Sequence, residues 1–145
     1  MINFKEIPEW WAMCQKGDCG MAEECLRHLA CRQAPNDLVK WKCVLPNAVD
    51  GSDECPLFVK AEKVMMARGL NRIYQNVHEK KARSAIRKAL TEFLGSKGSY
   101  YRYKDGERLL GPRLQEQICD IVHRYAPEAE VHFDESYENY DFTAR

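Results

Sequence analysis

Apolar residues recur at every third or fourth position in two long segments of the chain, 79–94 and 112–125. This spacing places them on one side of a helix and leaves the other side polar, so it predicts two amphipathic helices. Gly95 follows the first segment and Pro127 the second, and both residue types are common just beyond the end of a helix.

Shorter patterns predict further elements nearer the N-terminus. Cys55-Pro56 begins a helical segment that Gly69 ends, because proline suits a first helical turn and glycine a helix stop. Alternating apolar and polar residues predict a short strand at 38–45. We expect further helices at residues 21–33 and 55–68, and a short connector at 70–77 that would be a helix in a winged-helix arrangement.

A hairpin is expected at residues 100–110, where Asp105-Gly106 separates two β-prone runs. Val131 and Phe133 suggest a final strand. The pattern as a whole predicts an α+β protein with four or five helices and a small antiparallel sheet made from the hairpin and the C-terminal strand. We expect a single domain over residues 1–145, with a cysteine-rich region at 1–56 and a helical core at 57–145.

Composition excludes two classes of protein. With 45% apolar and 30% charged residues, the chain is too apolar to be disordered. Its apolar runs are only a few residues long, so we expect no membrane span and no membrane partner. The first residues lack a basic segment followed by an apolar stretch, as a secretory signal would have, and we expect a cytoplasmic location.

Seven cysteines in a reducing compartment favour metal binding over disulfides, and six of the seven lie in the first 55 residues. Thiolates are costly to bury alone but are good tetrahedral ligands of zinc. Cys14 and Cys19 on a loop, Cys25 on a helix and Cys55 at a helix start could converge on one ion, and His28 could reach it. The alternatives are an iron–sulfur site or cysteines that pack as small hydrophobic residues.

Several motifs spread over nearly the whole chain carry a family resemblance. They are Cys14, Asp18-Cys19, Cys25-Leu26-Arg27, Cys55-Pro56-Leu57-Phe58, Tyr100-Tyr101-Arg102-Tyr103, Gly106-Glu107-Arg108 and Phe133-Asp134 with Tyr137 and Tyr140. In these the chain resembles an uncharacterised bacterial family of Bacteroides-type gut organisms, catalogued as a domain of unknown function. The resemblance implies that the shared thiols are the four named above, and that Cys31 and Cys43 are peculiar to this member. It implies no activity.

Charge is unevenly distributed although the net charge is zero. Residues 68–113 hold 12 Lys and Arg against 4 Asp and Glu, whereas residues 114–145 hold 2 against 8. The basic face at 68–113 could bind nucleic acid or a protein partner, or it could receive the acidic tail. In a winged-helix arrangement, with helix 79–94 and hairpin 100–110 on the ligand, the contacts would come from Lys80, Arg83, Arg87, Arg102 and Lys104.

Signals of catalysis are few. The chain has no phosphate-binding loop, no nucleophile elbow and no zinc-protease motif, and the nearest acid–base pair is His132 with Asp134. The sequence therefore predicts a zinc-stabilised, non-enzymatic binding or regulatory module. Nucleic-acid binding is the first alternative, and a small enzyme or iron–sulfur redox protein the second.

Overall fold

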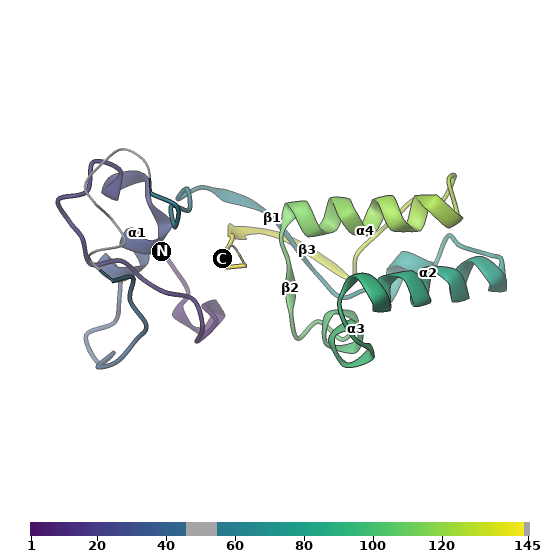
Figure 1. The fold of residues 1–145 in the computed structure, drawn as a ribbon, viewed down its shortest axis with the longest axis horizontal. Coiled ribbons are helices and arrows are strands. Elements are labelled where there is room, and N and C mark those ends of the chain that lie inside the picture. The colour runs from purple at the N-terminus through teal and green to yellow at the C-terminus, as the bar shows by residue number, and fades with distance from the viewer. Residues whose placement is uncertain (46–54, 144–145) are drawn as a thin grey trace. The chain divides into compact units, whose positions relative to one another are not determined.

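The structure, a computed structural model, describes residues 1–45 and 55–143 (Figure 1). The chain forms two compact units. Unit 1 comprises Met1–Lys63 and Tyr140–Arg145, and unit 2 comprises Val64–Asn139. The chain therefore leaves unit 1 at residue 63 and re-enters it at residue 140.

The α+β class is confirmed, with four α-helices and a three-stranded sheet in the described residues. The helices are α1 (Leu26–Arg32), α2 (Lys80–Phe93), α3 (Lys97–Lys104) and α4 (Pro112–Tyr125). The strands are β1 (Lys63–Arg68), β2 (Leu109–Leu110) and β3 (Glu135–Tyr140), in the order β2-β1-β3. Short 3-10 turns occur at η1 (Phe4–Glu6), η2 (Ala22–Glu24) and η4 (Arg72–Tyr74). No helix among the described residues is long and apolar enough to cross a membrane.

The core of unit 2 is built on α2 and α4, the two helices with the clearest periodicity. Ile86 and Leu90 of α2 and Ile118 and Val122 of α4 are fully buried in one cluster. Burial of four such side chains, each worth about 1.5–3 kcal/mol, explains why these helices form where the pattern predicted them. β1 lies against β2 in an antiparallel register that pairs Ala67 with Leu110.

The core of unit 1 is centred on Trp11, which is fully buried. Phe142, from the far end of the chain, packs edge-on against its ring at a centroid distance of 5.0 Å. Leu26 and Ala30 of α1 belong to the same cluster. The acidic and aromatic tail therefore packs on its own chain through Phe142, and it does so in the core of unit 1. The predicted helix 21–33 is present as η2 and α1, broken at Cys25.

The predicted helix at 55–68 is wrong, because Lys63–Arg68 forms β1. The segment is rich in Met and Ala, which favour helices in isolation. In the folded chain it pairs with β2 on one side and lies beside β3 on the other, and this tertiary pairing overrides a local preference of a few tenths of a kcal/mol per residue.

The predicted hairpin at 100–110 is also wrong, because its first strand is the helix α3. The side chain of Ser96 caps this helix by accepting a hydrogen bond from the backbone N–H of Ser99. Asp105 caps the other end and Gly106, at φ +84°, follows it, so the Asp-Gly pair ends a helix where a hairpin turn was expected. Only β2 remains of the second strand.

Two other strands differ from the prediction. In place of the strand at 38–45 there is a single bridge between Met13 and Cys43. The C-terminal strand is confirmed, but it lies at 135–140, beyond Val131 and Phe133. Those two residues are partly buried against the core of unit 2 without strand pairing. The apolar pattern at Val131 and Phe133 indicated that these residues are buried, but the residues that pair in the sheet are those that follow them.

A tight turn between β1 and η4 is held by Asp134. The carboxylate of Asp134 accepts hydrogen bonds from the backbone N–H of Arg72 (2.7 Å) and from the side chain of Asn71 (2.8 Å). Gly69 begins the turn with φ +84°, and a Cβ added there would collide with the Asp134 carboxylate. Glycine at position 69 thus serves both the backbone angle and the close approach.

We expect Gly69→Ala to destabilise the protein by about 2–4 kcal/mol, from the positive φ and the collision together. Gly95→Ala is the matched control. Gly95 also has a positive φ (+101°), but no atom lies within 4 Å of an added Cβ, so it should cost only about 1–2 kcal/mol. Urea unfolding of both variants measures the difference, and equal losses would contradict the Asp134 clamp.

The buried Tyr100 and the half-buried Tyr74 make stability depend on alkaline pH. The hydroxyl groups of Tyr74 and Tyr100 are 2.6 Å apart in unit 2. Burial, and then the hydrogen bond between the two hydroxyl groups, raise the pKa of Tyr74 well above its usual value, and burial raises the pKa of Tyr100. The folded state therefore keeps protons that the unfolded state releases near pH 10.

Stability should consequently fall as the pH rises through about 10, because the unfolded chain binds fewer protons there. Tyr74→Phe should lower stability at neutral pH by about 1 kcal/mol and make this alkaline decline less steep. Tyr125→Phe, at an exposed tyrosine of α4, should follow the wild-type curve. Urea unfolding at about pH 8 and about pH 11 tests this, and parallel curves for Tyr74→Phe and the wild type would refute it.

Candidate metal centre

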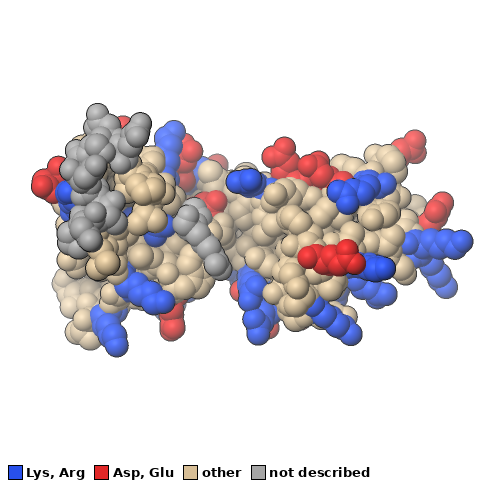
Figure 2. Space-filling view, in the orientation of Figure 1, with Lys and Arg blue, Asp and Glu red and all other residues tan. Residues whose placement is uncertain are grey.

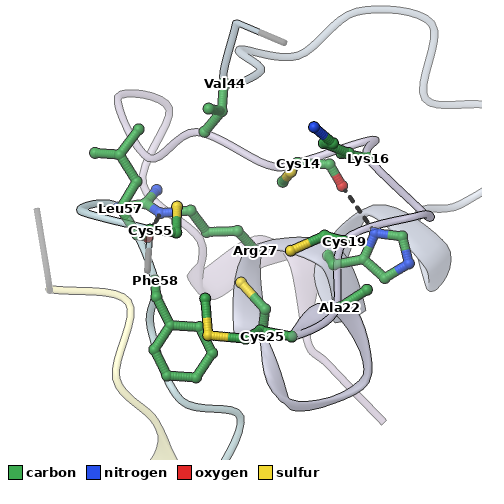
Figure 3. Close-up of a pocket in the computed structure, with 12 residues that line it drawn as sticks. Cys14, Lys16, Cys19, Ala22, Cys25, Arg27, Val44, Cys55, Leu57 and Phe58 are labelled. Atoms are coloured by element: carbon green, nitrogen blue, oxygen red, sulfur yellow. Dashed lines mark hydrogen bonds between the residues drawn. The ribbon is translucent and has the colours of Figure 1, made fainter. Parts of the chain in front are cut away.

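The four cysteines singled out in the sequence line a single cavity of unit 1. Its volume is about 20 Å³, enough for one water-sized particle. The thiols come from three separate stretches of chain: the loop before η2, the residue between η2 and α1, and the segment after residue 54. Figure 3 shows their side chains directed toward the space they surround, with Arg27 among them; they are Cys14, Cys19, Cys25 and Cys55.

Backbone hydrogen bonds bring these stretches together around the start of α1. The N–H of Cys14 donates to the carbonyl of Arg27 (3.1 Å). The N–H of Leu26 donates to the carbonyl of Val59 (2.7 Å), and Cys25 forms an antiparallel bridge with Lys60. The segment at Cys14 and the segment at residues 59–60 are thus both hydrogen-bonded to the chain at the start of α1.

Arg27 links the same stretches through its side chain. It is only 4% exposed, and its guanidinium lies over the ring of Trp11, 4.8 Å from the centroid. Its Nε donates to the carbonyl of Leu57 and a terminal nitrogen donates to that of Ala12, both at 2.7 Å. The side chain of Arg27 therefore links the segment just before Cys14 to the segment just after Cys55.

The charge of Arg27 also matters to the thiols. Burial lowers the pKa of its guanidinium, and the neighbouring thiolates of Cys25, Cys55 and Cys14 raise it. Arg27 therefore places a positive charge beside the sulfur atoms of the cavity. The ring of His28 contacts the same loop. Its Nδ1 lies 3.2 Å from the backbone carbonyl oxygen of Cys14, and this hydrogen bond orients the loop.

The remaining three cysteines lie outside the cavity lining. Cys31 is half-buried on α1, and burial raises the pKa of its thiol. Cys43 is exposed, and Cys119 is half-buried on α4, where burial again raises the pKa. A raised pKa keeps a thiol protonated and poorly suited to bind metal. All seven cysteines are free thiols.

The four thiols share a cavity without forming a coordination shell. In the described residues, no group of three or more His, Cys, Asp or Glu side chains could hold a metal ion as it stands. A zinc shell requires sulfur atoms at about 2.3 Å from one point in a tetrahedron. Rotation of the side chains about χ1 would have to supply that last adjustment, since the backbone segments are already side by side.

The predicted nucleic-acid residues have different surroundings from those of a winged helix. The helix expected at 55–68 is absent, and the first strand of the expected hairpin at 100–110 is part of α3, so that motif does not form. Arg83 donates to the carbonyls of Tyr74 and Val77 and so has a structural role. The others lie on α2 and α3: Lys80, Arg87 and Arg102 are exposed and Lys104 is half-buried.

His132 and Asp134, the predicted acid–base pair, each interact with other residues. Both carboxylate oxygens of Asp134 accept hydrogen bonds within the turn at residues 69–72. His132 instead lies 3.5 Å from a carboxylate oxygen of Glu130. This places Asp134 in a structural role.

Sequence reasoning did not assign a role to Arg27. The sequence places Arg27 only at the edge of the apolar side of a short helix, next to Leu26 and Ala30, a position that does not require burial. Its partners are backbone carbonyls, and no residue type marks them in a sequence.

Comparison with known proteins places the chain at the level of a family. Residues 1–142 match one described as a family of unknown function (DUF6078), a stretch that includes the four cavity cysteines and Arg27. No curated protein and no solved structure matches the chain. The chain therefore belongs to the family of unknown function DUF6078.

Proposed function

We propose that this protein is a non-enzymatic binding module whose unit 1 is stabilised by a structural zinc ion. The ligands would be Cys14, Cys19, Cys25 and Cys55. The observation that carries the proposal is that these four thiols, drawn from distant stretches of chain, line one ion-sized cavity. Four thiolates fill a tetrahedral shell and leave no position for a substrate, which is the pattern of a structural site.

The surroundings suit such a centre in charge as well as in donor type. A zinc ion together with four thiolates carries a net charge of −2, and burying that charge requires a nearby cation. Arg27 is buried beside the thiols, and Lys16 also lines the cavity. Backbone N–H groups and cations around the sulfur atoms are the usual outer support of a zinc site.

The same thiols bear on location. Seven free cysteines are compatible with a reducing compartment, and we place the protein in the cytoplasm. Unit 1 has a modest apolar core around Trp11, and a bound ion would add stability that this core lacks.

The first test is metal content, measured by plasma mass spectrometry on protein purified without a histidine tag. We expect about one zinc per chain, because four thiolates bind one ion. Serine variants at Cys14, Cys19, Cys25 or Cys55 should each lose the metal and lower the unfolding temperature. Serine variants at Cys31, Cys43 or Cys119 are the controls and should retain it.

Other results would contradict the proposal. Protein purified reduced and without chelator that contains no metal would leave the cavity cysteines as packing residues. A coloured protein that contains iron would replace zinc with an iron–sulfur cluster and a redox role.

A second prediction concerns Arg27. Arg27→Lys keeps the charge but cannot reach both carbonyls with one planar group, so we expect a loss of about 2–3 kcal/mol and about tenfold weaker zinc binding. Arg32→Lys is the matched control on the same helix, where Arg32 is exposed and pairs with Glu23, and it should cost less than about 0.5 kcal/mol. Urea unfolding and competition with a chromophoric chelator measure both effects; equal losses would refute the role of Arg27.

A further inference from the structure

A groove on unit 2 lies between α2 and α3. It encloses about 610 Å³, and its lining includes Arg87, Lys88 and Thr91 from α2 and Lys97 and Tyr101 from α3. Figure 2 shows Lys and Arg side chains projecting from the surface that these helices form. Lys88 and Lys97 were not among the residues expected to contact a ligand, whereas the tyrosines at 100, 101 and 103 already suggested stacking of single-stranded bases.

The groove is positively charged. Its lining contains three cations and a single carboxylate, Glu92. It lies within residues 68–113, which hold 12 basic against 4 acidic residues. Such a surface attracts a polyanion through long-range attraction and the release of counterions.

None of the three cations takes part in an ion pair in the part of the chain that the structure describes, and Arg87 lies close enough to Tyr74 and Tyr100 to lower their pKa values. The ion pairs there involve other residues, and no side-chain hydrogen bond engages Arg87, Lys88 or Lys97. Arg83 on the same helix differs, since it is held by two backbone carbonyls. Exposed cations gathered on a concave surface are therefore available to an anionic ligand.

An aromatic ring lies among these cations. Tyr101 is 41% exposed, and it packs edge-on against Tyr100 at a centroid distance of 5.3 Å. Tyr100 is itself buried and hydrogen-bonded to Tyr74, so the ring against which Tyr101 packs is fixed in position. The ammonium of Lys104 lies 5.9 Å from the Tyr101 centroid. An exposed ring on a rigid support, flanked by cations, is a platform on which a nucleobase can stack.

We infer that the α2–α3 groove binds single-stranded nucleic acid, with phosphates at Arg87, Lys88 and Lys97 and a base stacked on Tyr101. The exposed ring selects a single strand because a duplex keeps its bases stacked inside. The inference rests on the proposed binding function and gives that function its ligand class.

The test is fluorescence anisotropy of labelled oligothymidine with the full-length chain at several salt concentrations. The double variant Lys88→Glu/Lys97→Glu should weaken binding at least tenfold at low salt and should lower the salt slope by about 1.4, or about 0.7 for each lost phosphate contact. Arg113→Glu/Arg124→Glu is the control. It makes the same change of charge at two exposed positions of α4 outside the groove lining, and should weaken binding much less.

Two further variants separate stacking from charge. Tyr101→Leu should weaken binding about tenfold and leave the salt slope unchanged. Glu92→Gln should strengthen binding by removing the one carboxylate of the lining. Equal weakening in the groove and control variants would overturn the inference. So would equal affinity for a duplex, or full competition by inorganic phosphate at concentrations comparable to the oligonucleotide.

Metal analysis of the same preparations separates this inference from the zinc proposal. Zinc-loaded protein that does not bind oligothymidine refutes the groove and leaves the zinc centre intact. Metal-free protein that binds oligothymidine, with the losses expected for the variants, supports the groove and refutes the zinc centre.

Discussion

Unit 1 depends on the burial of one charged side chain. Arg27 is removed from water at a cost of several kcal/mol, which two short hydrogen bonds to carbonyls, the face of Trp11 and the nearby thiols offset. Because those partners belong to separate stretches of chain, satisfying this one guanidinium assembles the walls of the cysteine cavity. The cavity therefore forms where the buried guanidinium of Arg27 finds its hydrogen-bond partners.

Unit 2 is organised by apolar burial instead. The stripes of α2 and α4 form its core, and Asp134 secures the turn that follows β1. Because the core and the turn are formed by buried residues and by Asp134, the cations on the outer side of α2 remain exposed. Only Arg83 of that helix is drawn into the structure, by two carbonyls. The two units thus offer different chemistry: soft donors beside a buried cation in one, and an exposed basic groove in the other.

The accuracy of the sequence predictions follows the kind of interaction that forms each element. Helices α2 and α4 were predicted nearly to the residue because their signal is local and repeats over four turns. The strand β1 was mistaken for a helix because its partners lie more than 40 residues away. Asp105-Gly106 was mistaken for a hairpin turn because the same dipeptide can end a helix, and only the cap at Ser96 distinguishes the two.

The sequence by itself determined the α+β class, the two long helices, the basic character of residues 68–113 and the identity of the four thiols that share a cavity. Composition and periodicity encode the first three directly, since both are properties of neighbouring residues, whereas the four thiols were singled out by their spacing and by the family resemblance. Only the tertiary structure decided that Arg27 joins the cavity walls, that Phe142 returns to the core of Trp11, and that Lys97 and Tyr101 face the same groove as Arg87. The first two depend on contacts across long stretches of chain, and the third on the angle between two consecutive helices, and the sequence pattern provides no signal for either.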